Sequence, residues 1–466
     1  MASAVAIAAA APARKRPTRR VSERTIFTEA QAERQLRSLE LFGMRFGLER
    51  MRRMMTALGS PERRFHAIHV LGTNGKSSTT RMTAAILEGH GLRVAAYLSP
   101  HLVSYRERVL IDGRELDSDT FAAAIDRATW AATRVNRTLA EDDHVTQFEL
   151  LTAAALWEMA RAQVDVAVVE AGLGGRYDAT SVIEPRVSVL TNVGLEHTRW
   201  LGPTVTDIAE EKLAAVRAHT TLVLGQDIAA AALAVAERVA GERDVQIVHA
   251  RAQVPAQLLA RGAFQRRNFA LAATAAEAYL QTVGIPLGEQ ALAQAAASTQ
   301  VPGRLQLIEG NTPLVLDGAH NPDAVRALVA SLPEVLGVPK PAPAARPGPP
   351  GSAPAAPLAL VLGVLEDKDA TSMLAALMPL VARAWFTAPP SARALSPAAL
   401  QSLARQLGFQ DTVCEPKPAH ALEQAQRWAR EHAGAVLVTG SVYLVGDLLA
   451  SLGEPVELTA RRSSAR

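Results

Sequence analysis

The stretch with the clearest chemical meaning is Gly-Thr-Asn-Gly-Lys-Ser-Ser at residues 72–78, which follows an apolar run at residues 67–71. The order of strand, glycine turn, Lys-Ser and helix is typical of a phosphate-binding loop, in which backbone N–H groups and the helix N-terminus bind phosphate oxygens. The lysine adds a positive charge, and a hydroxyl holds Mg²⁺. The full motif has a glycine where this chain has Val70, so the match is a shortened form. A bare strand–turn–helix corner would show the same short pattern, but the flanking strand and helix favour the phosphate interpretation.

Ser99, Glu170 and His197 follow three further predicted strands. The strands at residues 164–170 and 187–193 are almost continuously apolar, which is typical of strands buried on both faces of a parallel sheet. Ligands collect at the carboxyl ends of such strands, here beside the phosphate loop. A carboxylate and an imidazole there can hold Mg²⁺ against a nucleotide. From the residues alone, His197 could equally be a hydrogen-bonding residue, and Glu170 could equally cap the loop that follows it.

Two basic residues lie further along the chain. Lys212 stands in Ala-Glu-Glu-Lys-Leu-Ala, and this spacing favours a solvated lysine paired with Glu210 or Glu211. Arg304 ends Val-Pro-Gly-Arg, which we interpret as a hinge between two domains. The planar, permanently charged fork of an arginine at a hinge suits a nucleotide phosphate held by the other domain. A structural salt bridge between the domains is the alternative.

The motif Asp-Gly-Ala-His-Asn-Pro at residues 317–322 follows a predicted strand and opens a predicted helix. Asp317 could accept hydrogen bonds from ribose hydroxyls or could bind His320. The pair Asn321-Pro322 is itself a helix start, so the motif could also be a capping turn. The two interpretations are compatible.

Strands that alternate with helices predict a doubly wound α/β fold. We place an ATP-binding domain at residues 31–300 and a smaller C-terminal α/β domain at residues 301–455. A segment rich in proline, alanine and glycine at residues 339–357 reads as a surface insertion. Basic tails at residues 1–30 and 456–466 read as disordered.

Composition limits the alternatives. The 466 residues are 48% hydrophobic and 20% charged, with a net charge of +3. The single cysteine excludes an intrachain disulfide, and no apolar run is long enough to span a membrane. The apolar N-terminal stretch precedes its basic cluster, which is the reverse of a signal peptide. We therefore expect a cytoplasmic protein without nucleic-acid or membrane partners, and we read the basic tails as solvated.

Ordered motifs along residues 36–452 resemble the folylpolyglutamate synthase and dihydrofolate synthase family of the Mur ligase superfamily. The motifs that carry this resemblance are Gly-Thr-Asn-Gly-Lys (72–76), Ser-Pro-His-Leu (99–102), Glu-Arg-Val (107–109), Thr-Gln-Phe-Glu (146–149), Glu-Ala-Gly-Leu-Gly-Gly-Arg-Tyr-Asp-Ala-Thr (170–180), Gly-Leu-Glu-His-Thr (194–198), Glu-Lys (211–212), Gln-x-x-Asn (265–268), Pro-Gly-Arg (302–304), Asp-Gly-Ala-His-Asn-Pro (317–322), Asp-Lys-Asp (367–369) and Thr-Gly-Ser (439–441). The resemblance implies a Mur-ligase-like ATPase domain with a phosphate loop, followed by a smaller Rossmann-like domain.

The resemblance also implies site residues. Those implied to bind ATP are Gly72, Thr73, Asn74, Gly75, Lys76, Ser77 and Ser78 in the loop, Asn268 at adenine, Arg304 at the phosphates and Asp317 at ribose. The implied metal ligands, for two Mg²⁺ ions, are Ser78, Ser99, Glu170, His197 and Lys212. Lys212 would act as an N-carbamate, which reverses the reading from its spacing. The implied catalytic residues are Lys76, Lys212, Arg304 and His320.

The implied reaction joins L-glutamate to dihydropteroate or to the γ-carboxylate of a folate through an acyl phosphate. The residues implied to bind the pterin-bearing substrate are Thr146, Gln147, Phe148, Tyr177, Asp178 and Ala179, and residues 46–49 are a weaker addition. The alternatives are a single activity of the two, another Mur-type amide ligase, or a nucleotide-binding regulatory module. We expect a monomer acting on small molecules.

Four residues depart from the family pattern. Ser77 replaces the third loop glycine, and Glu196 replaces the aspartate before the metal-site histidine. Ser181 and Gln306 replace an asparagine and a glutamate. These changes bear on the geometry of the phosphate loop and on the substrate range.

Overall fold

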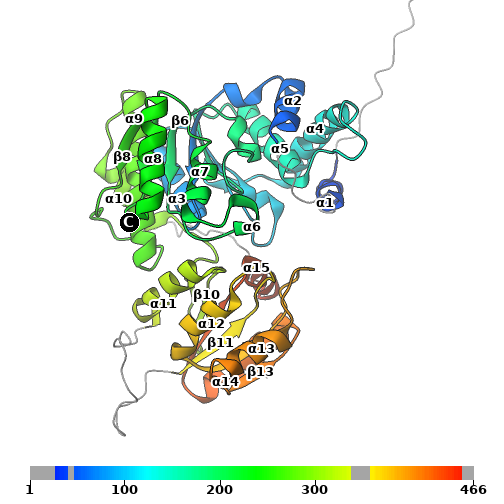
Figure 1. Cartoon of the computed structure of the whole chain (residues 1–466), viewed down its shortest axis with the longest axis vertical. Coiled ribbons are helices and arrows are strands. Elements are labelled where there is room, and N and C mark those ends of the chain that lie inside the picture. Colours follow the sequence, from blue (N-terminus) through cyan, green and yellow to red (C-terminus); the bar gives the residue numbers. More distant parts are fainter. Residues whose placement is uncertain (1–26, 40–46, 337–356, 454–466) are drawn as a thin grey trace, which may run out of the picture.

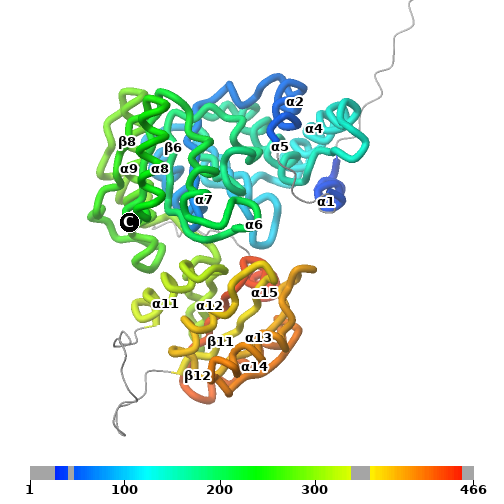
Figure 2. The backbone as a smooth tube through the Cα atoms, viewed as in Figure 1, coloured from blue at the N-terminus to red at the C-terminus, as the bar shows by residue number. Residues whose placement is uncertain are grey.

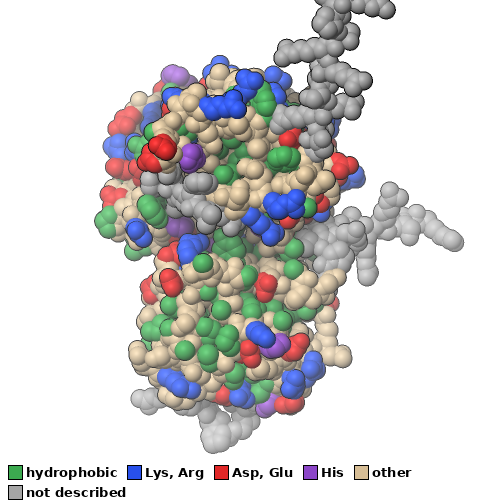
Figure 3. Space-filling view, turned by 90° about the vertical axis from the view of Figure 1, so that its right-hand side faces the viewer, with side chains coloured by type: hydrophobic (Ala, Val, Ile, Leu, Met, Phe, Trp, Pro, Cys, Tyr) green, Lys and Arg blue, Asp and Glu red, His purple; other side chains and the backbone are tan. Residues whose placement is uncertain are grey.

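A computed structural model describes residues 27–39, 47–336 and 357–453, which form an N-terminal and a C-terminal lobe (Figure 1). The predicted basic tails and the Pro-rich insertion lie almost entirely outside the described residues. The space-filling view shows the two lobes one above the other (Figure 3). Within the described ranges, no helix is long and apolar enough to cross a membrane.

The N-terminal lobe is built on an eight-stranded sheet of order β4-β3-β2-β5-β1-β6-β7-β8. Six strands are parallel, and the β3–β4 hairpin adds an antiparallel edge. Its strands are β1 His66–Leu71, β2 Val94–Tyr97, β3 Val109–Ile111, β4 Arg114–Glu115, β5 Val166–Glu170, β6 Pro185–Leu190, β7 Thr221–Leu224 and β8 Gln246–His249. Every residue of β5 is buried, as its continuous apolar run predicts.

Helices cover both faces of this sheet, and two of them, α3 and α9, pack closely against each other (Figure 1). The lobe also contains short 3₁₀ segments at Pro61–Arg63, Tyr105–Arg108 and Ala179–Val182. Its helices are α1 Glu29–Ser38, α2 Glu49–Leu58, α3 Lys76–Glu88, α4 Ser118–Asn136, α5 Gln147–Arg161, α6 Thr198–Leu201, α7 Val205–Leu213, α8 Ala230–Arg243, α9 Ala263–Thr282 and α10 Glu289–Ser298.

The C-terminal lobe repeats the α/β arrangement on a six-stranded sheet of order β13-β12-β11-β14-β10-β9, in which only β9 pairs antiparallel. Its strands are β9 Gln306–Ile308, β10 Leu314–Leu316, β11 Leu358–Leu362, β12 Val381–Phe386, β13 Thr412–Cys414 and β14 Ala435–Thr439. Its helices are α11 Pro322–Leu336, α12 Ala370–Leu377, α13 Pro397–Gln406, α14 Pro418–Glu431 and α15 Val442–Ser451, with a 3₁₀ segment at Met378–Leu380.

Most predicted strands and helices are present with shifted ends. The predicted strand at residues 187–193 ends at Leu190, and the loop after it carries the polar residues. The elements that the sequence did not predict include α8, β8, β9, β13 and the β3–β4 hairpin. The α/β prediction is confirmed, with two mixed sheets in place of purely parallel ones.

The two lobes meet through α11 and α15, which lie on the side of the C-terminal lobe that faces the N-terminal lobe (Figure 1, Figure 2). Arg266 of α9 forms a two-pronged ion pair with Glu334 of α11, with distances of 2.7 and 2.9 Å. Leu102 packs so closely on α15 that a Cβ added at Gly446 would lie 2.0 Å from the Leu102 carbonyl oxygen. The site described next lies at this boundary.

Candidate active site

The loop predicted to bind phosphate spans residues 72–75, and the strand β1 and the helix α3 flank it. Gly75 has φ +82°, and a Cβ added there would lie 2.6 Å from Oδ1 of Asn268. Glycine is therefore required both by the left-handed backbone and by the close approach of α9. Asn268, expected at the adenine, packs against the loop and donates from Nδ2 to Gln265 Oε1 at 3.0 Å.

Two lysines converge on the carbonyl oxygen of Gly72. Lys76 Nζ donates to it at 3.1 Å and to the Thr73 carbonyl oxygen at 3.0 Å, and Lys212 Nζ donates to the Gly72 carbonyl oxygen at 2.7 Å. Lys212 is only 5% exposed. Burial and then the charge of Lys76 lower the pKa of Lys212 to about 7. Two amines therefore meet at one carbonyl oxygen of the loop, and the lowered pKa of Lys212 leaves a part of this amine uncharged near pH 7.

The surface interpretation of Lys212 is wrong. Its helix α7 turns the lysine into the lobe, and the two neighbouring carboxylates pair elsewhere. Glu210 binds Arg238 at 2.9 Å, and Glu211 binds Arg176 at 2.8 Å. Charge spacing on a helix does not identify which face packs inward, so the sequence alone favoured the exposed alternative.

Glu170, at the end of β5, is 1% exposed and is held at both oxygens. Ser77 Oγ donates to Oε1 at 2.9 Å, and the Ser99 backbone N–H donates to Oε2 at 3.0 Å. Burial raises the pKa of Glu170, and the charge of Lys76 and these hydrogen bonds oppose the rise. The expected convergence of Ser99 and Glu170 beside the loop is therefore present. Ser77, the departure from the family pattern, contacts this carboxylate directly.

A divalent cation fits this corner through its donor chemistry. Across the described ranges, no three His, Cys, Asp or Glu side chains gather as a self-sufficient metal site. A cation here would instead share its ligands between protein oxygens and nucleotide phosphates, as Mg²⁺ usually does. Ser78, in the first turn of α3, is buried next to the loop. His197 has a left-handed backbone, and burial lowers the pKa of His197 to about 4, so its imidazole is neutral near pH 7.

The hinge residues lie behind the loop. Asp317 is buried and accepts backbone N–H groups from Leu305 at 2.7 Å and Ala319 at 2.8 Å. Burial raises the pKa of Asp317, and the charge of Arg304 opposes this rise. The Arg304 guanidinium lies beside Gly318, where an added Cβ would be 2.5 Å from its Nη1. The charge of Arg304 is also the smallest of the causes that oppose the rise of the Glu170 pKa. Arg304 has no ion pair within the described ranges, so the salt-bridge alternative is not supported.

Residues of the C-terminal lobe reach the loop directly. The Asn321 and Asn74 side chains exchange hydrogen bonds of 2.9 and 3.3 Å. Asn321 Oδ1 also accepts from the Ala324 N–H at 2.9 Å and thereby caps α11, so the predicted helix start is confirmed. His320 does not bind Asp317, contrary to that alternative. Its Nδ1 lies 2.8 Å from the Gly318 carbonyl oxygen.

Glu196 joins the two lobes. Its Oε1 lies 3.0 Å from His320 Nε2 and 3.1 Å from Lys368 Nζ. Burial alone would raise the pKa of Glu196, but the hydrogen bond from His320 and the positive neighbours hold it well below its usual range. Sequence reasoning assigned no role to Lys368. The Asp-Lys-Asp motif was its only signal.

One cleft of about 1570 Å³ connects these parts. It runs from the loop and the C-terminal lobe to the wall formed by α5 and the segment after β5. The predicted site residues that line it are Asn74, Ser99, Thr146, Gln147, Phe148, Tyr177, Asp178, Ala179, His197 and His320. The predicted site residues that do not line it are Gly72, Thr73, Gly75, Lys76, Ser77, Ser78, Glu170, Lys212, Asn268, Arg304 and Asp317.

The cleft wall is built by local hydrogen bonds. Thr146 caps α5 in a reciprocal capping box with Glu149. Gln147 Nε2 donates to the Leu36 carbonyl oxygen and to the Tyr105 hydroxyl, each at 3.1 Å. Phe148 presses on Gly172, where an added Cβ would lie 2.5 Å from the ring. In the weaker addition at residues 46–49, residue 46 lies outside the described residues, and Glu49 pairs with Arg53 on the surface.

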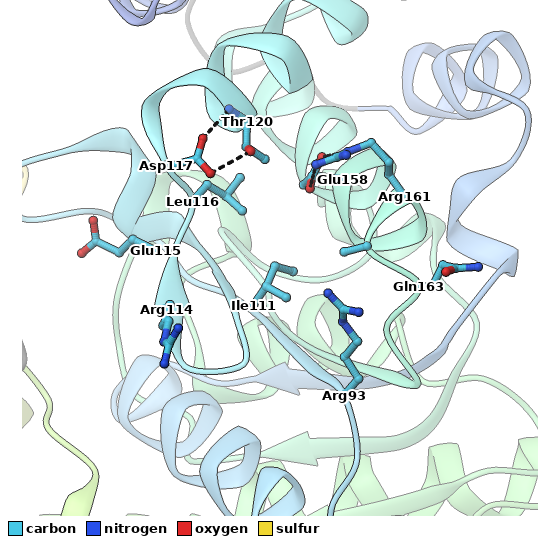
Figure 4. A pocket seen from close by; sticks show the side chains of 11 residues that line it. Arg93, Ile111, Arg114, Glu115, Leu116, Asp117, Thr120, Glu158, Arg161 and Gln163 are labelled. Carbon is cyan, nitrogen blue, oxygen red and sulfur yellow. Dashed lines mark hydrogen bonds and ion pairs between the residues drawn. The ribbon is translucent and has the colours of Figure 1, made fainter. Parts of the chain in front are cut away.

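A second, smaller hollow of about 360 Å³ lies over β3, β4, α4 and α5 (Figure 4). Several of its charged groups already form an ion pair or cap a helix. Arg161 binds Glu158 at 2.7 Å, and Asp117 accepts the Thr120 N–H at 2.7 Å to cap α4. Neither a phosphate loop nor a candidate metal ligand reaches this hollow, so the larger cleft is the candidate active site.

The fold and the cleft define a Mur-ligase-type enzyme. Residues 70–253 match the family model described as "Mur ligase middle domain", and residues 304–451 match "Dihydrofolate synthetase, C-terminal domain". The chain is 31% identical to the folylpolyglutamate synthase of Lacticaseibacillus casei over 428 residues, which are 86% of this chain and 94% of that protein. The chain belongs to the folylpolyglutamate synthase and dihydrofolate synthase family, and the family resemblance is confirmed.

Solved structures of this family share the fold. A Mycobacterium tuberculosis folylpolyglutamate synthase complexed with ADP and AMPPCP matches with a TM-score of 0.82 at 28% identity, covering 92% of this chain and 99% of that one. A bifunctional folylpolyglutamate synthase/dihydrofolate synthase with Mn, AMPPNP and L-glutamate bound matches with a TM-score of 0.75 at 27% identity, covering 92% and 100%.

Proposed function

We propose that this chain joins L-glutamate to dihydropteroate, to the γ-carboxylate of a folate or tetrahydrofolate, or to both, at the expense of ATP. The observation that carries the proposal is the continuous cleft. Asn74 of the predicted phosphate loop and Ser99, which follows β2, line the cleft on one side. Phe148 of α5, Asp178 of the segment after β5 and His320 of the C-terminal lobe line the same space. Family membership supports the same reaction.

The reaction must solve a leaving-group problem. A carboxylate is a poor acyl donor because its leaving group would be oxide. In the first step, a carboxylate oxygen of the acceptor attacks the γ-phosphorus of ATP, and ADP leaves. In the second step, the glutamate amine attacks the acyl carbon, phosphate leaves, and the amine loses a proton as the amide forms.

The residues contribute mainly position and charge. Lys76 and Arg304 would neutralise the charge that develops as ATP and a carboxylate approach each other. The loop N–H groups and the start of α3 would bind the phosphates. The Asn74–Asn321 contact and the ion pairs of Glu196 hold the lobes together, which would exclude water from the acyl phosphate.

We assign Mg²⁺ to the corner formed by Ser78, Ser99, Glu170 and His197. Bound there, it would supply positive charge at the transferring phosphoryl group. The role of Ser77 and the Ser99 N–H is to hold the Glu170 carboxylate in one orientation. The structure with Mn and AMPPNP bound supports a divalent cation in this family.

We further propose that Lys212 reacts with CO₂ to give an N-carbamate that serves a second Mg²⁺ ion. The amine nitrogen forms a bond to the carbon of CO₂ and releases a proton. Only the neutral amine reacts, and a pKa of about 7 leaves a large neutral fraction at physiological pH. A carbamate would also replace the repulsion between Lys212 and Lys76 with attraction.

The test is phosphate release with ATP, Mg²⁺ and L-glutamate, measured with dihydropteroate, dihydrofolate or tetrahydrofolate in separate reactions. We expect release that depends on at least one acceptor and on glutamate. Which acceptors respond decides between one activity and two. Release that no acceptor stimulates would contradict the proposal and favour a nucleotide-binding regulatory module.

Assignments of domains, oligomeric state, location and partners belong to the same proposal. We assign residues 31–300 to the ATP-binding domain and residues 301–455 to the glutamate-ligase domain. We infer a monomer that acts in the cytoplasm on small molecules and has no nucleic-acid partner.

The basic N-terminal tail would then have no part in catalysis. Removal of residues 1–25 should leave catalysis unchanged, and loss of activity in that truncated chain would contradict the assignment of this tail.

A further inference from the structure

His69 is a buried histidine that the proposed reaction does not use. It lies in β1, three residues before the phosphate loop, and its side chain is 0% exposed. Its strand neighbours at this level are Val169 and Ser188. Burial, and then the charge of Arg217, lower the pKa of His69 to about 3. The ring is therefore neutral throughout the physiological pH range.

A chain of hydrogen bonds leads from His69 to the cleft. His69 Nε2 lies 2.9 Å from Thr180 Oγ1, and this hydroxyl makes a short hydrogen bond to Asp178 Oδ1. The Thr180 N–H donates to the same oxygen at 3.0 Å, and the Leu173 N–H donates to Oδ2 at 2.7 Å. Asp178 and Leu173 line the cleft.

The directions of these hydrogen bonds follow from proton counting. Burial raises the pKa of Asp178, and the hydrogen bonds from Thr180 and from the Leu173 N–H oppose this rise. Each carboxylate oxygen of Asp178 already faces a backbone N–H, Thr180 at Oδ1 and Leu173 at Oδ2, so both oxygens act as acceptors. The Thr180 hydroxyl has one proton, and it must donate this proton to Asp178. Its oxygen can then only accept from His69, so the imidazole carries its proton on Nε2.

This tautomer leaves the other ring nitrogen with a lone pair. Across the described part of the chain, Nδ1 of His69 has no hydrogen-bond partner. An apolar side chain at this position would avoid that penalty, because buried polar atoms without partners are destabilising. We therefore attribute the presence of a histidine at position 69 to its Nε2–H donor, which fixes the rotation of the Thr180 hydroxyl.

We propose that His69 is a positioning residue for the acceptor substrate, acting through Thr180 to hold Asp178 at the cleft wall. This inference rests on the proposed function, in which the acceptor occupies the cleft beside Asp178. Without the His69 donor, the Thr180 hydroxyl is free to rotate away from the carboxylate. Asp178 then loses a fixed orientation, whereas the phosphate loop keeps all of its own contacts.

The kinetic test compares variants of His69 and Thr180. His69→Leu and Thr180→Val remove the relay, while His69→Gln and Thr180→Ser keep a donor and a hydroxyl. We expect His69→Leu and Thr180→Val each to raise the acceptor KM about fivefold, the factor expected for one buried hydrogen bond, with the ATP KM changed less than twofold. Since both act through one relay, the double variant His69→Leu/Thr180→Val should resemble either single variant. The donor-keeping variants should stay near wild type.

The matched control is His66→Leu. His66 lies in the same strand, but its Nδ1 lies 3.0 Å from the Tyr279 hydroxyl, away from Asp178. This variant should leave the acceptor KM unchanged. An unchanged acceptor KM in Thr180→Val, or equal rises of both KM values in the relay variants, would overturn the proposal and indicate a structural role only.

Nuclear magnetic resonance of the wild-type imidazole nitrogens gives a readout independent of activity and of variant folding. We expect a single Nε2–H tautomer for His69 that does not titrate between pH 5 and 8. An Nδ1–H tautomer would overturn the relay. If wild-type protein showed no acceptor-dependent phosphate release, the proposed function would fail, whereas the tautomer measurement would still report on the relay itself.

Discussion

Glu196 of the N-terminal lobe accepts a hydrogen bond from Lys368 of the C-terminal lobe at 3.1 Å, and both side chains are only 8% exposed. His320 Nε2 lies 3.0 Å from the same carboxylate oxygen. A buried ion pair is a weak source of stability compared with apolar packing, yet removing one partner leaves an uncompensated charge. This pair therefore determines the relative position of the two lobes more than the stability of either lobe by itself.

Glu196→Gln should loosen the contact between the lobes. The amide keeps the shape of the side chain but not its charge, and Lys368 then remains buried beside Asp367 alone. Because Lys368 keeps this one partner, we expect a loss in unfolding experiments smaller than the loss of about 3–5 kcal/mol for a fully unpaired buried charge, together with a fall in glutamate ligation. The control is Glu242→Gln, whose exposed pair with Arg238 should contribute about 0–1 kcal/mol. Equal small losses in both variants would show that the interlobe pair is not structurally important.

Ser77→Ala should weaken divalent-cation binding, because Glu170 loses the hydroxyl that holds its Oε1. Removal of a residue that orients a metal ligand typically lowers affinity by about 10–100-fold. Mn²⁺ binding to the nucleotide complex, followed by electron paramagnetic resonance, measures this directly. Ser77→Thr keeps the hydroxyl and should bind Mn²⁺ like wild type. Wild-type affinity in Ser77→Ala would mean that the Ser99 N–H alone positions the carboxylate.

Lys212→Ala should abolish most ligation while leaving the fold intact, because the carbamate is lost. The direct observation is a carbamate signal in carbon-13 spectra of protein equilibrated with labelled bicarbonate, present in wild type and absent in the variant. Lys417→Ala, at an exposed lysine, is the control and should change neither measurement. Full activity in Lys212→Ala would refute the carbamate role.

Glu88, the last residue of α3, makes the stability of the protein depend on pH. Burial, and then the charge of Asp112, raise the pKa of Glu88 from 4.5 to about 7. Between these values the folded state holds more protons than the unfolded state, so stability falls as pH rises from about 4.5 to 7. Glu88→Gln should be the more stable form above pH 7 and should flatten this part of the profile.

Thermal unfolding measured at half-unit pH intervals checks this expectation. The exposed Glu242→Gln variant serves as the control and should keep the wild-type profile. A Glu88→Gln profile that parallels wild type across this range would show that Glu88 titrates alike in the folded and unfolded states.

Most of the nucleotide corner could be predicted from the sequence because parallel strands bring their carboxyl ends to one edge. Residues that follow β1, β2 and β5 therefore had to meet, and Ser77, Ser99 and Glu170 do so. The chemical types of these residues then narrowed the site to phosphate and cation binding.

Contacts that depend on packing between separate elements could not be predicted. Periodicity did not reveal that α7 turns Lys212 inward, because the flanking glutamates suggested a solvated face. The position of one lobe on the other is set by many side chains far apart in sequence, so no local pattern showed that Lys368 contacts Glu196 or that Asn74 contacts Asn321. The β3–β4 hairpin was missed because strands of two or three residues show too little alternation.

The most direct test of an acyl-phosphate ligase is the fate of the acceptor's carboxylate oxygen. Dihydropteroate or tetrahydrofolate labelled with oxygen-18 in the reacting carboxylate is incubated with ATP, Mg²⁺ and L-glutamate, and the released phosphate is analysed by mass spectrometry. One labelled oxygen in each phosphate, for each amide formed, is the predicted result. Amide formation with only unlabelled phosphate would contradict the proposed reaction.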